Sequence, residues 1–114
     1  MGGTGFNIQA FLAYLGEDRD LAMELLAAFV EDAPVRLRSL IEAAGSGDAE
    51  AAVRAAHSLK GMCGVIRDQE ATAQALDLEM AGRRGDVAAL RAGLPALEQS
   101  LARILERARA FLAA

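Results

Sequence analysis

The chain has 114 residues, a formal net charge of −4 and a composition that is 54% hydrophobic, with one histidine and one cysteine. Its length suits one domain around one core, and its interspersed charges give no basic patch of the kind that binds nucleic acid or a membrane surface. No stretch approaches the roughly 18 apolar residues of a membrane span. A lone cysteine excludes an intramolecular disulfide and fits a reducing compartment, so we expect a cytoplasmic protein.

The first residues, "MGGTG", carry no basic or apolar run typical of a secretory signal. We therefore expect residues 1–5 to be a flexible lead-in and residues 6–114 to be a single domain. The segment "NIQAFLAYLG" predicts a short opening helix, with Asn7 as its N-cap and Gly16 at its end.

A long helix is predicted from about Asp18 to Ala44, because apolar residues recur there at spacings of three and four. The apolar stripe keeps its phase across Pro34, which favours a kink over a break. The sequence "GSGD" ends this helix, and Asp48 caps a second one that runs to about Ile66.

Two further helices complete the predicted fold. One covers about Asp68 to Arg83 and ends at "RRGD", where Gly85 is the stop and Asp86 caps the last helix. The apolar stripe of the last helix also continues across its internal proline. Amphipathic helices joined by short loops bury their stripes against each other, so we predict an all-α fold, an antiparallel up-down four-helix bundle with a short additional N-terminal helix.

The only histidine, His57, is predicted to face away from the core of this bundle. On a helical projection, the apolar residues of its helix fall within roughly 60° of the opposite direction. These residues are Ala52, Ala55, Leu59, Met62, Cys63 and Ile66. The side of the histidine itself carries Arg54, Lys60, Gly61 and Gly64, with Val65 at its edge.

Two glycines beside an exposed histidine argue for access by another molecule. Each glycine inside a helix costs about 1 kcal/mol relative to alanine, and this chain uses alanine almost everywhere else. A buried core histidine or an ordinary solvated one are the alternative interpretations. The helical phase counts against the first and the glycines count against the second.

Several kinds of chemistry are excluded by the surroundings of His57. One histidine with one cysteine on the opposite face supplies too few ligands for a metal, and no serine and acid complete a triad with it. An exposed imidazole is, however, a competent nucleophile near neutral pH. If it attacks a phosphoryl group brought by another protein, the ammonium of Lys60 one turn away would offset the negative charge.

The segment His57-Ser58-Leu59-Lys60-Gly61, with Gly64 as a further small residue, resembles the core motif of histidine-containing phosphotransfer (HPt) domains. The flanking segments "GDAEAAVRAAH" and "ALDLEMAGRRGD" are also similar to the family, the second through its Leu-x-x-Glu and Gly-Asp turn. The resemblance covers essentially the whole chain and implies a four-helix bundle.

The resemblance implies a phosphoryl carrier rather than a stand-alone enzyme. His57 would accept the phosphoryl group from a receiver-domain aspartate and pass it to another receiver, with Lys60 as charge support. The partner would contribute Mg²⁺ and most catalytic groups, so we expect no cofactor or metal here. The expected partners are response-regulator receiver domains and possibly a hybrid sensor histidine kinase. The docking face would comprise Arg54, Ser58, Gly61, Gly64, Val65 and Arg67.

Arg67 departs from the family pattern, which usually has a small residue, often glycine, at this position. A continuing helix would place Arg67 about 80° from His57, near the docking face. The alternative, which we favour, is that the helix ends here and Asp68 caps the next one.

Two other functions fit the same residues. The chain could be the phosphoacceptor domain of a chemotaxis-type histidine kinase, phosphorylated directly from ATP, because that motif is nearly identical. It could also be a structural or adaptor bundle with an inert histidine.

Overall fold

The computed structural model describes residues 5–114, and every regular element among them is an α-helix. The helices are α1 (Ile8–Tyr14), α2 (Arg19–Ser46), α3 (Ala49–Val65), α4 (Gln69–Arg83) and α5 (Val87–Ala113). The all-helical prediction is confirmed for this part of the chain. The predicted flexible lead-in lies outside the described residues, apart from Gly5. None of the five helices is long and apolar enough to cross a membrane.

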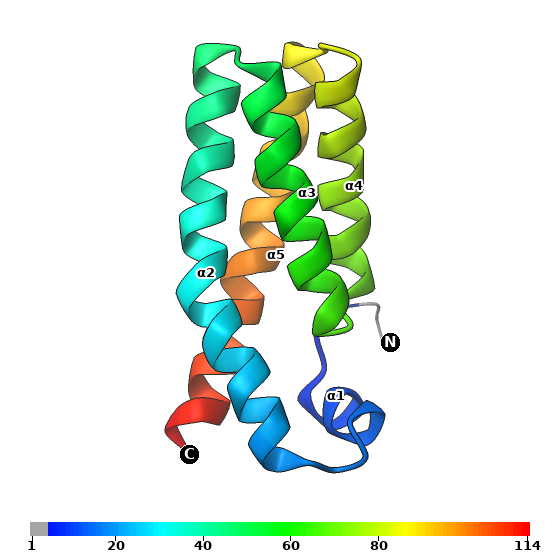
Figure 1. Ribbon diagram of the computed structural model, residues 1–114, viewed down its shortest axis with the longest axis vertical. Coiled ribbons are helices and arrows are strands. Elements are labelled where there is room, and N and C mark those ends of the chain that lie inside the picture. The colour runs from blue at the N-terminus through cyan, green and yellow to red at the C-terminus, as the bar shows by residue number, and fades with distance from the viewer. Residues whose placement is uncertain (1–4) are drawn as a thin grey trace.

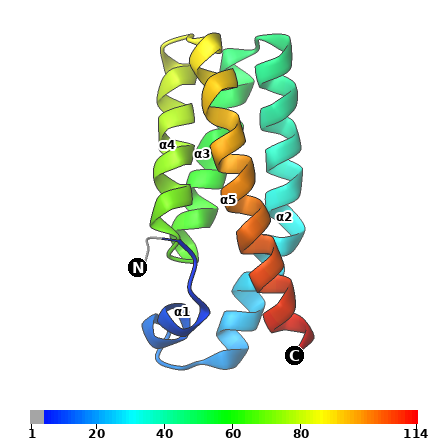
Figure 2. The same cartoon turned by 180° about the vertical axis from the view of Figure 1, so that it is seen from behind.

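The four long helices lie side by side, and each runs antiparallel to the one before it (Figures 1 and 2). Helix α3 contacts α2 and α4, and α5 contacts the same two helices from the other side. Helix α1 lies below α3, near the beginning of α2 (Figure 1). One broad face of α3 is therefore left uncovered between α2 and α4.

Each helix begins at an Asn or Asp whose side-chain oxygen accepts a hydrogen bond from the backbone N–H three residues later, as such caps do. The caps are Asn7, Asp18, Asp48, Asp68 and Asp86. The four caps predicted from the sequence, Asn7, Asp48, Asp68 and Asp86, are confirmed, and Asp18 is a further cap at the predicted start of its helix. Both prolines lie inside continuous helices, as expected, and Figure 1 shows α2 changing direction in its blue-to-cyan part.

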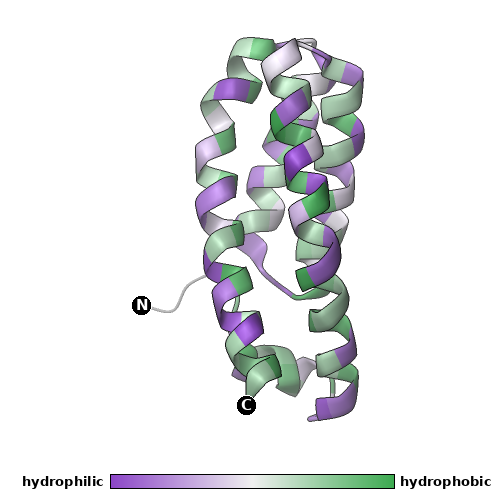
Figure 3. Ribbon diagram, turned by 90° about the vertical axis from the view of Figure 1, so that its left-hand side faces the viewer, coloured by the Kyte–Doolittle hydropathy of each residue, from purple (hydrophilic) through white to green (hydrophobic). Residues whose placement is uncertain are grey.

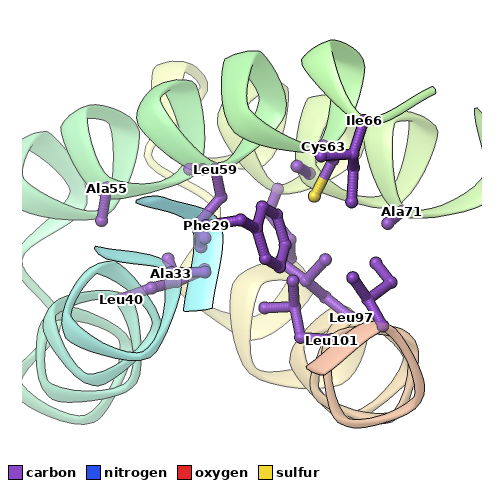
Figure 4. Packing of buried hydrophobic residues seen from close by; sticks show 14 of the residues in the cluster. Phe29, Ala33, Leu40, Ala55, Leu59, Cys63, Ile66, Ala71, Leu97 and Leu101 are labelled. Carbon is purple, nitrogen blue, oxygen red and sulfur yellow. The ribbon is translucent and has the colours of Figure 1, made fainter. Parts of the chain in front are cut away.

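The inward stripe of α3 packs in the core against α2 and α5. Figure 4 shows Leu59 and Cys63 of α3 beside Phe29 of α2, with Leu97 and Leu101 of α5 opposite. All five side chains are buried. Burial, with a smaller effect of the Asp68 carboxylate, raises the pKa of the Cys63 thiol to about 12, so this thiol stays protonated in the core. Hydrophilic and hydrophobic residues alternate along each helix (Figure 3), as expected when one face is buried.

The segment before α1 is tied to the lower end of the bundle. The backbone N–H of Phe6 donates to Asp68 Oδ2 at 2.7 Å, and its carbonyl accepts from Arg107 at 2.8 Å. The Phe6 ring is buried and lies edge-on to Phe11 of α1. Asp68 thus both caps α4 and holds the N-terminal segment.

Candidate functional site

His57 lies in the middle of α3, and its side chain is 63% exposed. The residues predicted for the core stripe of α3 are buried, apart from Met62, which is half-buried at the edge towards α2. The predicted outward orientation of His57 is therefore confirmed. Its Nδ1 lies 3.2 Å from Oε2 of Glu79 on α4, which leaves the Nε2 side of the ring as the exposed side.

Glu79 is the residue that joins the charged side chains of the site. Its side chain is only 4% exposed, although it carries a carboxylate. Lys60 Nζ lies 2.8 Å from Oε1, an oxygen that has no further hydrogen-bond partner among the described residues, and Arg83 Nη2 donates to Oε2 at 2.6 Å. Two cations and one imidazole therefore surround a single buried carboxylate.

The close approach of α3 and α4 allows Glu79 to reach His57. One turn beyond Glu79, Gly82 faces α3, where an added Cβ would lie 2.7 Å from a methyl group of Val53 and 3.2 Å from the carbonyl of Ala49. A side chain at position 82 would force the two helices apart. The absence of one keeps the carboxylate within hydrogen-bond distance of the imidazole.

The partners of Glu79 lower the pKa of its carboxyl group from the ordinary 4.5 to about 2. The hydrogen bond from Lys60 contributes most, followed by that from Arg83, and His57 adds a smaller effect in the same direction. Burial opposes them, because it disfavours the charged form. The carboxylate is consequently ionised throughout the physiological range.

An ionised Glu79 determines which nitrogen of His57 carries the proton. A carboxylate can only accept hydrogen bonds, so Nδ1 must be the donor in this contact. In the neutral imidazole, Nε2 then holds the lone pair. The site therefore presents an oriented nucleophilic nitrogen to solvent.

Three of the predicted docking residues lie with His57 around one surface hollow of about 470 Å³ between α2 and α3: Ser58, Gly61 and Val65. Gly61 and Gly64 are exposed, and a Cβ built on either meets no other atom within 4 Å. The surface beside the imidazole is thus open at both glycines.

Arg54 and Arg67 lie apart from this hollow. Arg54 is exposed and lines a separate hollow, between α3 and α4, with Gly82 and Arg83. Arg67 follows the end of α3 with a φ of 66°, and its guanidinium lies 4.2 Å from the centroid of the Tyr14 ring. The prediction that α3 ends here and Asp68 caps α4 is confirmed. This left-handed conformation suits glycine, the kind of residue that the resemblance leads one to expect at this position.

No role was predicted for Glu79 or Arg83, although both lie in the segment ALDLEMAGRRGD that resembles HPt domains. The apolar pattern of α4 nevertheless indicated that Glu79 is buried. It stands four residues after Ala75 and eight after Ala71, so it falls on the buried stripe of α4. A carboxylate in that position is costly unless it is paired, and its partners were the outward Lys60 and His57.

Within residues 5–114, no three His, Cys, Asp or Glu side chains gather closely enough to hold a metal ion. The cations of Lys60 and Arg83 surround the only acid that approaches His57 there. The described site is thus built to hold an imidazole beside fixed positive charge.

Comparison with known proteins gives one family and one solved structure. The sequence profile of the Hpt domain matches residues 24–107. The crystal structure of histidine-containing phosphotransfer protein B (HptB) from Pseudomonas aeruginosa PAO1 superposes with a TM-score of 0.84 at 27% sequence identity. The match covers 95% of this chain and 94% of that one. Among curated protein sequences, no relative matches the chain.

Proposed function

Because this chain belongs to the Hpt domain family, whose members carry phosphoryl groups in two-component systems rather than act as enzymes, we propose that it is a phosphorelay intermediate. His57 accepts a phosphoryl group from the aspartate of a receiver domain and passes it to the aspartate of another. The side-by-side packing of α2 to α5, with α1 below, is consistent with the antiparallel four-helix bundle predicted from the sequence.

The observation that carries this proposal is the contact between Glu79 and Nδ1 of an imidazole that is otherwise 63% exposed. The lone pair of Nε2 attacks the phosphorus of the partner's aspartyl phosphate. A nitrogen–phosphorus bond forms as the bond to the carboxylate oxygen breaks, and the carboxylate leaves with the electron pair. The ring becomes positively charged, and the Glu79 carboxylate stabilises it through the Nδ1 proton.

Lys60 supports the same step by its charge. The Lys60 side chain is 30% exposed and lies one turn from His57, and its ammonium is held by Glu79. From there it offsets the negative charge of the phosphoryl oxygens. The Mg²⁺ that this chemistry uses is expected on the receiver, as the resemblance to HPt domains implies.

The test is phosphoryl transfer from receiver domains charged with acetyl phosphate, followed by assay for acid-labile phosphate on this protein. We expect labelling of the parent protein and none of His57→Gln, which should keep its fold because the side chain is exposed and the glutamine amide can still donate to Glu79. Persistent acid-labile phosphate on His57→Gln would exclude this histidine as the acceptor. Labelling by a histidine kinase with ATP, but by no receiver, would instead favour a phosphoacceptor domain of the chemotaxis type.

A further inference from the structure

A groove runs between α2 and α3 from His57 towards the lower end of α3. Its upper part is the hollow of about 470 Å³ beside His57, and its lower part is a hollow of about 160 Å³ that reaches Ile66. The two parts share Asp32, Met62 and Val65, so they are continuous. We refer to them together as the α2–α3 groove.

Apart from Asp32, the side chains in the middle of the α2–α3 groove are apolar, and the groove is open there. Val65 is 51% exposed, Met62 is half-buried, and Gly61 adds no side chain. The lower part is lined mainly by apolar residues, which are Leu25, Ala28, Phe29 and Ile66. A groove between two helices with an apolar floor fits the apolar face of a third helix.

Two charged side chains of α2 line this groove. Asp32 and Arg36 stand one turn apart, a spacing at which opposite charges on a helix often pair. Both are exposed, and neither forms an ion pair with any residue of the described chain, 5–114. Arg36 lines only the His57 end, whereas Asp32 lies in the part that the two hollows share.

The charge around His57 is opposite in sign to that of the whole protein. The chain carries a net charge of −4, but cations outnumber acids around the imidazole and its hollow, where Arg36, Lys60 and Arg83 stand against Glu79 and Asp32. Such a local field attracts a negatively charged site, and a phosphorylated carboxylate is one. Asp32, at the centre of the groove, is negatively charged and therefore favours a basic group of the partner there.

We propose that Asp32 and Arg36 determine which receiver domain this protein accepts. The receiver lays an amphipathic helix in the α2–α3 groove, with a basic side chain opposite Asp32 and an acidic group opposite Arg36. Receivers with the reverse charges are rejected, because like charges at close range are unfavourable and are not compensated. This inference rests on the proposed function and assigns the choice of partner to two named residues of α2.

The experiment compares the charge reversals Asp32→Lys and Arg36→Glu with matched changes on α5. Glu106→Lys and Arg109→Glu are suitable controls, since both residues are exposed and unpaired in the described chain. Helix α5 is also diagonally opposite α3. The probes are isolated receiver domains from the source genome, each charged with acetyl phosphate. The readout is kcat/KM for transfer to His57 at low and at physiological salt.

We expect each reversal on α2 to lower kcat/KM with the preferred receiver by about tenfold or more and to weaken its salt dependence. The matched changes on α5 should leave kcat/KM and its salt dependence unchanged. Phosphoramidate, a small donor that needs no docking, should label every variant equally. Reversal of the facing basic residue on the receiver should restore transfer to Asp32→Lys, and Asp32→Asn should show an intermediate loss if Asp32→Lys folds poorly.

The alternative outcomes separate the two levels of the proposal. If no receiver transfers phosphate to the parent protein, the proposed function fails, and this inference fails with it. If transfer occurs but Asp32→Lys and Arg36→Glu match their α5 controls, only the inference is overturned. A dimer of the protein alone that Asp32→Lys dissociates would assign the groove to a second copy and would also overturn it.

Discussion

The two buried carboxylates at α4, Asp68 and Glu79, are each only 3% exposed, but they are satisfied in different ways. Asp68 accepts hydrogen bonds from backbone N–H groups, of Ala71 at 2.8 Å and of Phe6 at 2.7 Å. Glu79 has only side-chain partners: His57, Lys60 and Arg83.

The difference separates a structural acid from one suited to chemistry. Backbone amides neither titrate nor move independently, so Asp68 stabilises the junction of α3, α4 and the N-terminal segment. Side-chain partners can redistribute when a new charge arrives. The cations that hold Glu79 can therefore also contact a phosphoryl group on His57. The predictions below test this contrast, from the largest expected effect to the smallest.

Lys60→Ala should have the largest effect, on transfer. Loss of a charged donor at a transferring phosphoryl group typically costs about 10²-fold in rate. The melting temperature should also fall, because the variant leaves Oε1 of Glu79 buried without its ion-pair partner. Lys60→Arg keeps the charge, so it should recover most of the transfer rate and most of the melting temperature. Single-turnover kinetics and thermal melts decide this, and an unchanged rate in Lys60→Ala would make the lysine a purely structural partner.

Asp68→Ala should affect stability and spare the chemistry. It removes the N-cap of α4 and the hydrogen bond to Phe6, together about 2 kcal/mol of the free energy of unfolding. Asp48→Ala is the matched control, since Asp48 caps α3 at 3.0 Å, and loss of a cap alone costs about 1 kcal/mol. Denaturant unfolding measures both. Equal losses would mean that the tie to Phe6 adds nothing.

Glu79→Gln should change how stability depends on pH. The folded pKa of about 2 lies below the ordinary 4.5, so the unfolded chain binds the proton more readily. The stabilisation by Glu79 is therefore fully present above pH 4.5 and is lost as pH falls from there towards 2. Melts across this range should show a shallower loss in Glu79→Gln than in the parent. Parallel curves would contradict the lowered pKa.

Gly64 makes no contact with either carboxylate and should show the smallest effect on stability. Gly64→Ala should gain up to about 1 kcal/mol, because the added Cβ meets open space and the residue has no positive φ. Gly64→Leu should keep that stability but slow transfer by projecting beside the imidazole. A melt and a transfer assay on both variants provide the check. Transfer to Gly64→Leu at the parent rate from every receiver would show that the partner approaches from another side.

The local sequence pattern was sufficient to predict the helices and the direction of the His57 side chain. Asn and Asp before apolar stripes predicted the helix starts, because a cap needs only a side-chain oxygen and a backbone N–H three residues later. The phase of α3 predicted the exposed face of His57, because burial of Leu59 and Cys63 fixes the rotation of the helix. These features depend on residues within a few turns of each other.

Only the tertiary structure could join Glu79 to His57, 22 residues away on another helix. The contact depends on how closely α3 and α4 approach at Gly82, which is a property of two packed surfaces rather than of either stripe. The same is true of the α2–α3 groove, where Asp32 and Met62 come from different helices. The sequence alone therefore predicted the fold class, the positions of the helices and the outward direction of the histidine. Packing decided which charges surround that histidine, because its ion pairs and the groove beside it form between residues that lie on different helices and far apart along the chain.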